Sequence, residues 1–290
     1  RVLASEALHG LAPMESLDYT GLYPAARLTG TDRYFPVSVT VDASGTIIPR
    51  NVKDSSLPAA LFRVHLTSTS DDPQAVQLAF CLENFLGRGG TVVEPERRRR
   101  FDEGYYEVWE ERSGNCEKPL TEGNLHGLLF DGGEKEEKRS EGQYVLASGD
   151  PVSAHLAGWR PDEQPDVWRR FLETGELPAP DRAASEGEVT AGGLVMEAEL
   201  DPGESHTFDF VFAWHVPHFW QVEGPDYGHY YNKHFSSARE VAVYALQDFD
   251  RLSNEAGAVP ELLMDSSLPE WLSRSLCNDA YVFSNAIWVT

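Results

Sequence analysis

Short runs of alternating apolar and polar residues recur along the first 215 residues of the chain. Each run is bounded by glycine, proline, aspartate or asparagine, which favour turns. Because successive side chains on a strand point to opposite faces of a sheet, such runs bury one face, which a second layer must cover. The pattern therefore predicts an antiparallel β-sandwich. The clearest runs are YFPVSVTVDASG (34–45), LFRVHLTSTSDDP (61–73), VQLAFCLENF (76–85), GLVMEAELDPGE (193–204) and SHTFDFVFAWHVP (205–217).

Two turn sequences between these runs predict β-hairpins, one at residues 71–73 (DDP) and one at residues 201–203 (DPG). The charged stretch 131–143 predicts an exposed loop. Residues 160–190 are rich in proline and predict an excursion from the sandwich. That excursion holds one short amphipathic helix, whose apolar residues are Val167, Trp168, Phe171 and Leu172.

The periodicity changes after residue 233, where apolar residues recur every three or four positions. Ser237 and Glu240 stand at the capping-box spacing of a helix start. The stretch 254–257 (NEAG) has the composition of a helix end. We therefore predict one long helix between these two points. Its apolar stripe consists of Val241, Tyr244, Ala245, Phe249 and Leu252.

The pentapeptide DSSLP occurs twice, at 54–58 and at 265–269. The first copy precedes an alternating run and predicts entry into a strand. The second precedes a helical pattern, with Ser267 and Glu270 again at capping-box spacing, and predicts the start of a helix. Because the flanking residues decide its structure, the pentapeptide is not an internal repeat.

We expect three parts along the chain: a β-sandwich domain at 1–232, a connecting helix at 233–260 and the start of a helical domain at 261–290. The first residue is Arg1 rather than methionine, and an apolar, helix-like pattern (DAYVFSNAIWVT) continues to Thr290. Stable folds seldom end on an uncovered apolar face. We therefore expect both ends to be truncated.

The net charge of −23 argues against nucleic acid and anionic membranes as partners, because both require a basic face. No stretch has the length of a membrane helix, and the N-terminus lacks the pattern of a signal peptide. Three widely spaced cysteines predict neither a disulfide framework nor a zinc site. We expect a cytoplasmic protein without a cofactor. The acidic, lysine-poor composition fits either adaptation to high salt or a GC-rich genome.

Several sequence features look like sites but have simpler interpretations. His215 and His218 have HxxH spacing, yet Pro217 and the preceding strand place them at a strand end, so we expect no metal there. Ser55 and Ser56 lack the G-x-S-x-G context of a nucleophile, so we expect them to make capping or turn hydrogen bonds.

The most ligand-like stretch is an aromatic and amide cluster between residues 214 and 232. Stacking rings and amides suit a sugar, but they suit a domain interface as well. The cluster lies where the sheet domain is followed by helices, which favours a domain interface. Sugar binding is the alternative function of the cluster. The cluster contains Trp214, Trp220, His229, Tyr230, Tyr231 and Asn232, of which Trp214, His229, Tyr230 and Asn232 are the candidate substrate-binding residues.

Residues 19–24 (YTGLYP) and 48–64 (IPRNVKDSSLPAALFRV) resemble the N-terminal domain of glycoside hydrolase family 116. This is the family of the non-lysosomal glucosylceramidase, also called bile-acid β-glucosidase. The resemblance continues in order along the chain through 82–84 (LEN), 212–215 (FAWH), 228–231 (GHYY) and 267–272 (SLPEWL). The sequence departs from the family pattern at Ala25-Ala26 and at 277–281 (CNDAY).

The resemblance implies a two-domain retaining β-glycosidase whose N-terminal sandwich packs on an (α/α)6 barrel that carries a Glu nucleophile and an Asp acid/base. The matching positions lie beyond Thr290, so we expect no catalytic residue in this chain. The implied partners are its own C-terminal catalytic domain and a β-glucoside or glucosylated lipid substrate. Its implied role is to brace the barrel and wall the substrate entrance through residues 214–232. The alternative is a stand-alone carbohydrate-binding sandwich.

Overall fold

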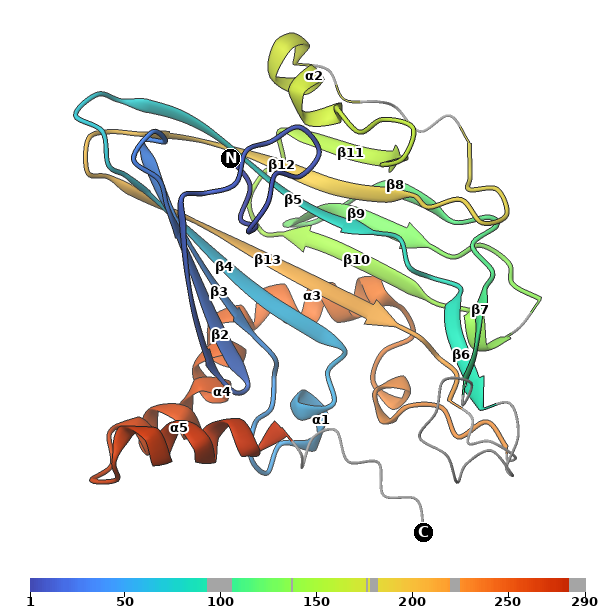
Figure 1. The fold of residues 1–290 in the computed structure, drawn as a ribbon. Helices are drawn as coiled ribbons and strands as arrows, with labels where there is room; N and C mark the ends of the chain where they lie inside the picture. Colours follow the sequence, from blue (N-terminus) through green and yellow to red (C-terminus); the bar gives the residue numbers. More distant parts are fainter. Residues whose placement is uncertain (93–105, 137, 176, 178–181, 220–224, 282–290) are drawn as a thin grey trace.

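The computed structural model describes residues 1–290 except 93–105, 137, 176, 178–181, 220–224 and 282–290. An eight-stranded, wholly antiparallel sheet forms the centre of the fold (Figure 1). In spatial order its strands are β1 (Ser16–Leu22), β2 (Ala25–Thr31), β3 (Val37–Ser44), β4 (Ala59–Ser68), β13 (Ser205–His215), β10 (Gln143–Ser148), β9 (Leu125–Asp131) and β8 (Cys116–Glu122).

A second, three-stranded sheet covers one face of the first and consists of β11 (Ala154–Trp159), β12 (Ala191–Leu200) and β5 (Gln74–Glu83). Apolar side chains from both sheets form the core between them, among them Leu128, Phe130 and Met196. The sheets approach closely at Gly192, where a Cβ atom would lie 2.3 Å from Cδ2 of Leu128. The fold is thus the predicted antiparallel β-sandwich.

Smaller elements complete the sandwich. β6 (Arg88–Val92) and β7 (Tyr106–Glu110) pair as a separate two-stranded sheet. The predicted short helix is α2 (Val167–Thr174), which buries Val167, Trp168 and Phe171 against Trp159. Its fourth predicted apolar residue, Leu172, is 68% exposed. One-turn 3-10 helices lie at η2 (Lys138–Ser140) and η3 (Tyr230–Lys233).

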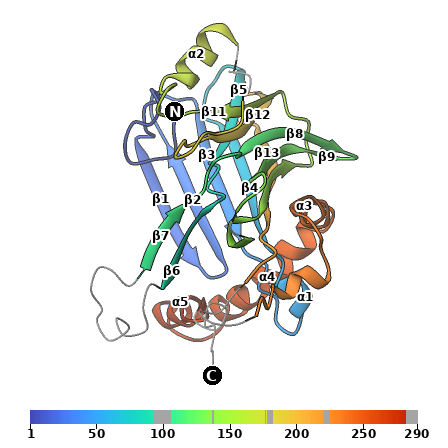
Figure 2. The same cartoon turned by 90° about the vertical axis from the view of Figure 1, so that its right-hand side faces the viewer.

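Helices cover part of the other face of the eight-stranded sheet, so the molecule has three layers. α3 (Ala238–Gln247) and α4 (Phe249–Met264) bury a second core against that face, which includes Leu61, Val211 and Val241. α1 (Val52–Ser55) precedes β4, and α5 (Glu270–Asp279) follows α4. Figures 1 and 2 place α4 and α5 at one end of the molecule and α2 at the opposite end.

Both predicted hairpins are wrong. The Asp-Asp-Pro turn connects β4 of the large sheet to β5 of the small one, and the Asp-Pro-Gly turn connects β12 of the small sheet to β13 of the large one. β4 pairs with β13 and β5 pairs with β12, so the two crossing turns lie side by side. The backbone N–H of Ser68 donates to the carbonyl of Glu204 at 2.9 Å. Alternation shows that one face is buried, but it does not show which strand is the neighbour.

The long helix between 237 and 257 differs from its prediction in two ways. It is interrupted at Asp248, whose φ of −109° and ψ of 18° separate α3 from α4. It also continues past Gly257 and through Pro260 to Met264. Ala256 and Pro260 are both buried, so tertiary packing outweighs the local helix-ending signals.

α3 and α5 begin close to where the sequence predicts. Of the two predicted serine caps, Ser237 and Ser267, only Ser237 caps its helix. Ser237 Oγ accepts the backbone N–H of Glu240 at 3.2 Å, and α3 begins there as predicted. The second DSSLP does lead into α5, yet Pro269 is the N-cap and no side chain caps that helix. Instead Ser266 Oγ donates to the carbonyl of Leu263 at 2.7 Å, which ends α4.

Candidate functional site

Residues 229–232 pack against the residues that follow β13. The Tyr231 hydroxyl donates to the carbonyl of Val216 at 2.7 Å and accepts the N–H of the same residue at 3.3 Å. Asn232 Nδ2 donates to the carbonyl of Pro217 at 2.6 Å. The His229 ring stacks on Tyr231, with 4.9 Å between ring centroids and an angle of 6°. The side chains that looked most ligand-like thus make local contacts that shape this segment.

The structure divides the four candidate residues between two places. Trp214, together with Tyr231, lines a cavity of about 380 Å³ beside the first DSSLP segment. His229, Tyr230 and Asn232 are not among its lining residues. Trp220, also part of the cluster, lies outside the described residues. The other lining residues are Tyr23, Pro24, Gly45, Thr46, Ile47, Ser55, Ser56, Leu57, Pro58 and Ala59.

The serine and threonine hydroxyls that line this cavity form hydrogen bonds with backbone groups. Ser55 Oγ donates to the carbonyl of Ile48 at 2.7 Å and accepts its N–H at 2.9 Å. Ser56 Oγ donates to Lys53, and Thr46 Oγ1 donates to the carbonyl of Asp54 at 2.8 Å. Ser55 and Ser56 therefore make the turn hydrogen bonds that the sequence predicts. The cavity is lined by apolar residues and three aromatic residues, Tyr23, Trp214 and Tyr231, rather than by an activated nucleophile.

A buried carboxylate joins this region to the helices. Asp54 Oδ1 accepts the Tyr244 hydroxyl at 2.7 Å, and Oδ2 accepts Arg251 at 2.9 Å and Asn51 Nδ2 at 2.6 Å. Burial alone would raise the pKa of the Asp54 carboxyl, but the hydrogen bonds from Tyr244, Arg251 and Asn51 together outweigh it and lower that pKa. We call this cluster of Asn51, Asp54, Tyr244 and Arg251 the Asp54 latch.

A second polar contact lies beside the latch. Arg63 of β4 donates from Nε and Nη2 to the two carboxylate oxygens of Asp209 on β13, each at 2.7 Å, and Nη2 also donates to Asp250 of α4 at 2.7 Å. Sequence reasoning missed both contacts. Asp54 and its helical partners are about 190 residues apart in the chain, and no periodic pattern links positions so distant. The available signal was a single acidic residue in an otherwise apolar and turn-forming segment.

The histidines of the HxxH pair have different partners. His215 Nε2 lies 3.2 Å from the carbonyl of Phe235, and burial lowers the pKa of its imidazole. His218 lies between Asp226, at 2.5 Å from Nδ1, and Glu141, at 3.2 Å from Nε2. Within the part of the chain that the structure describes, no three His, Cys, Asp or Glu side chains gather as metal ligands.

Exposed apolar side chains concentrate on α4, α5 and the residues beside them. On α4 they include Leu262, which is 71% exposed, and on α5 they include Trp271, also 71% exposed. Large exposed apolar areas mark surfaces that bind another protein surface or a ligand. The full set within residues 259–281, which we call the α4–α5 surface, is Val259, Leu262, Leu268, Trp271, Leu276 and Tyr281. In the described ranges, no helix is long and apolar enough to cross a membrane.

Comparison with known protein families shows the family to which the chain belongs. The model of the family described as beta-glucosidase 2, glycosyl-hydrolase family 116 N-term, matches residues 4–252. The matched range includes the sandwich, the Asp54 latch and α3, and it ends within α4.

Two solved structures resemble the chain weakly. A protein described as a kojibiose phosphorylase from the human microbiome has 11% sequence identity and a TM-score of 0.39, over 89% of this chain and 23% of that one. A TPR-domain containing protein from Parabacteroides distasonis has 10% identity and a TM-score of 0.32, over 94% of this chain and 52% of that one. The chain spans about a quarter and about half of their respective lengths.

Proposed function

Because the chain belongs to the family of N-terminal domains of glycosyl hydrolase family 116, we propose that it is the non-catalytic N-terminal domain of a retaining β-glycosidase. Its partner is a C-terminal (α/α)6 domain that carries the catalytic carboxylates. The substrate of the whole enzyme is a β-glucoside or a glucosylated lipid. The role of this chain is to brace the catalytic domain and, through residues 214–232, to wall the substrate entrance.

The α4–α5 surface is the observation that carries the bracing role. Leu262 and Trp271 are large, apolar and mostly exposed, and they lie C-terminal to the range 4–252 that the family model matches. Burying a side chain of this size contributes about 1.5 to 3 kcal/mol. A helical domain that continues from α5 would cover these side chains. The free thiols of Cys81, Cys116 and Cys277 accord with a reducing, cytoplasmic location.

Replacing Trp271 with aspartate in the full-length enzyme should weaken the contact between its two domains. The change removes an apolar anchor and places a charge in the buried contact, at a cost of about 2 kcal/mol or more. We expect easier proteolysis between the domains, a lower unfolding temperature and reduced hydrolysis of an aryl β-glucoside. Limited proteolysis, calorimetry and a steady-state assay on the same preparation measure the three effects.

Leu172→Asp is the matched control for this experiment. Leu172 is 68% exposed on α2, at the opposite end of the molecule from α5 (Figure 1). We expect this control to behave like the wild type. Equal effects of Leu172→Asp and Trp271→Asp, or no effect of either, would argue against the α4–α5 surface as the domain contact.

Residues 1–290 alone should not hydrolyse aryl β-glucosides. Retaining hydrolysis needs two carboxyl groups about 5 to 5.5 Å apart on either side of the glycosidic bond, and the family resemblance puts both beyond this chain. The measurement is release of p-nitrophenol from p-nitrophenyl β-glucoside by the purified chain. Turnover that a single substitution within residues 1–290 abolishes would refute the non-catalytic assignment.

A carbohydrate-binding sandwich is the alternative function, because Trp214 and Tyr231 line the cavity of about 380 Å³. Titration with glucose or cellobiose, followed by tryptophan fluorescence, separates the two functions. A sugar stacked in this cavity would change the emission of Trp214 with a saturable dependence, and Trp214→Phe would remove that change. A bracing domain gives no saturable change in either protein.

A further inference from the structure

A histidine lies between two carboxylates just after the end of β13. His218 Nδ1 is 2.5 Å from Oδ2 of Asp226, and its Nε2 is 3.2 Å from Oε2 of Glu141. Glu141 lies in the loop between η2 and β10, and β10 pairs with β13. The His218 side chain is 21% exposed. We call Glu141, His218 and Asp226 the His218 tether.

The tether connects backbone on both sides of Asp226 to the loop before β10. Oδ1 of Asp226 accepts the backbone N–H of Phe219 at 3.1 Å and that of Gly228 at 3.0 Å. The N–H of Tyr227 donates to the carbonyl of Phe219 at 2.9 Å. Asp226 therefore joins residues 216–219 to residues 225–228, and His218 joins Asp226 to Glu141.

Only a charged imidazole can bind both carboxylates. A neutral imidazole has one N–H group and one nitrogen lone pair, so it donates to a single carboxylate, whereas a charged ring donates from both nitrogens. The contact to Asp226 is the shorter one, so Nδ1 keeps the proton of the neutral ring and the lone pair of Nε2 then faces Glu141. The bond to Glu141 is therefore present while the ring is charged, and it is lost as the pH rises and the ring loses a proton.

Two further histidines lie beside His218 in the described part of the chain. His215 interacts with it electrostatically, and the His229 side chain forms a hydrogen bond with its backbone. Burial lowers the pKa of both of these imidazoles, so they do not compete with His218 for the two carboxylates. The hydrogen bond from His218 lowers the pKa of the Asp226 carboxyl, which keeps that carboxylate ionised in mildly acidic solution.

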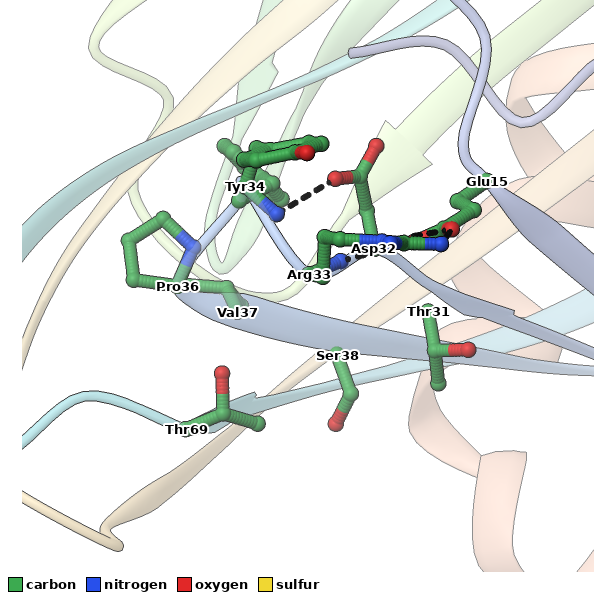
Figure 3. A pocket seen from close by; sticks show the side chains of 10 residues that line it. Glu15, Thr31, Asp32, Arg33, Tyr34, Pro36, Val37, Ser38 and Thr69 are labelled. Atoms are coloured by element: carbon green, nitrogen blue, oxygen red, sulfur yellow. Dashed lines mark hydrogen bonds and ion pairs between the residues drawn. The ribbon is translucent and has the colours of Figure 1, made fainter.

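Other surface ion pairs do not have this dependence on pH. Figure 3 shows one of them, Glu15 with Arg33, and arginine keeps its charge throughout the pH range in which proteins are folded. His65 Nε2 lies 3.3 Å from Asp42, but its Nδ1 lies 3.0 Å from the hydroxyl of Thr207. Because a hydroxyl can donate or accept, His65 keeps both contacts in either charge state.

We propose that the His218 tether is a pH-sensitive contact, which holds residues 216–219 and 225–228 to the loop before β10 at mildly acidic pH and loses its bond to Glu141 at alkaline pH. Histidine suits this task, because its charge ordinarily changes between pH 5 and 8. Both stretches lie within the range 214–232 that we propose to border the substrate entrance, so the tether would make that border depend on pH. This consequence rests on the proposed function, whereas the tether itself does not.

Hydrogen exchange of residues 1–290 at pH 5.5 and pH 8.5, measured by mass spectrometry and corrected for the intrinsic exchange rate, tests the tether. In peptides that include residues 216–219 or 225–228, we expect about two- to fivefold faster exchange at pH 8.5, the range for loss of one partly exposed ion pair. Glu141→Gln should remove this pH dependence, because an amide accepts a bond from the charged ring and donates one to the neutral ring. His218→Gln should remove it as well, because glutamine does not change its charge.

His65→Gln is the matched control, because it removes a histidine that also faces a carboxylate but lies on β4. In this variant we expect the same peptides to keep the pH dependence of the wild type. Circular dichroism shows whether each variant is folded. Equal corrected exchange of the wild type at the two pH values would overturn the proposal, and so would a pH dependence in Glu141→Gln equal to that of the wild type.

Discussion

Replacing Asp54 with alanine will lower the free energy of unfolding by about 3 kcal/mol. The Asp54 side chain is 4% exposed and accepts hydrogen bonds from Tyr244, Arg251 and Asn51. The variant leaves the Tyr244 hydroxyl and Nη1 of Arg251 without this acceptor. It thereby removes the hydrogen bonds that join α3 and α4 to the segment before β4. Urea unfolding followed by circular dichroism measures the loss.

Asp250→Ala is the control for this prediction. Asp250 also joins the sheet to α4, through Arg63, but its side chain is 78% exposed. Exposed ion pairs contribute about 0 to 1 kcal/mol, so a loss below 1 kcal/mol is expected. Equal losses in the two variants would show that the Asp54 latch contributes no more than a surface ion pair.

Stability from the latch should also depend on pH. The pKa of Asp54 is lowered in the folded protein, so its stabilising contribution is present above the pKa of an unfolded aspartate. That contribution is lost as the pH falls through the lowered folded-state pKa. The stability difference between wild type and Asp54→Ala should therefore shrink in strongly acidic buffer.

Replacing Glu117 with alanine will lower the free energy of unfolding by about 3 to 5 kcal/mol. Glu117 of β8 is 2% exposed and lies between the two sheets. Its Oε1 accepts Asn84 Nδ2 and the Thr190 hydroxyl, each at 2.8 Å, and its Oε2 accepts the N–H of Gly158 at 3.0 Å. The variant leaves three buried donors without this acceptor. Urea unfolding again gives the magnitude.

Glu122→Ala on the same strand serves as the control, because the Glu122 side chain is 51% exposed and forms an ion pair with the exposed Arg239. We expect a change below about 1 kcal/mol. A Glu117→Ala variant as stable as this control would mean that the buried carboxylate does not connect the sheets.

The pH dependence at Glu117 has the opposite sign to that at Asp54. Burial raises the pKa of the Glu117 carboxyl, although hydrogen bonds from Asn84 and Thr190 oppose the shift. Ionised Glu117 therefore costs stability above the pKa of an unfolded glutamate, and this cost disappears as the pH falls through the raised folded-state pKa. The stability difference between wild type and Glu117→Ala should widen on mild acidification.

The strands could be predicted from the sequence because each of the clearest runs buries one face. β3 and β13 lie within the alternating runs that predicted them, and β4, β5 and β12 overlap theirs but begin two residues earlier. Their pairing could not be predicted, because β4 meets β13, and β5 meets β12, across more than 100 residues of chain. Local turn residues such as Asp-Pro-Gly fit a crossing between sheets as well as a hairpin.

The candidate site was less predictable than the fold, because its contacts join distant segments. Trp214 does line a cavity, but the position of the Asp54 latch depends on three-dimensional packing. The continuation of α4 through Gly257 and Pro260 has the same origin, since burial of Ala256 and Pro260 stabilises a helix that local propensity disfavours.

The coding sequence that follows the codon for Thr290 is the most direct test of the proposal that this chain braces a glycosidase. The account predicts an open reading frame that encodes a series of helical hairpins with a Glu and an Asp as candidate catalytic carboxylates. A stop codon within a few residues of Thr290 would contradict it, because the α4–α5 surface would then have no domain of its own chain to brace.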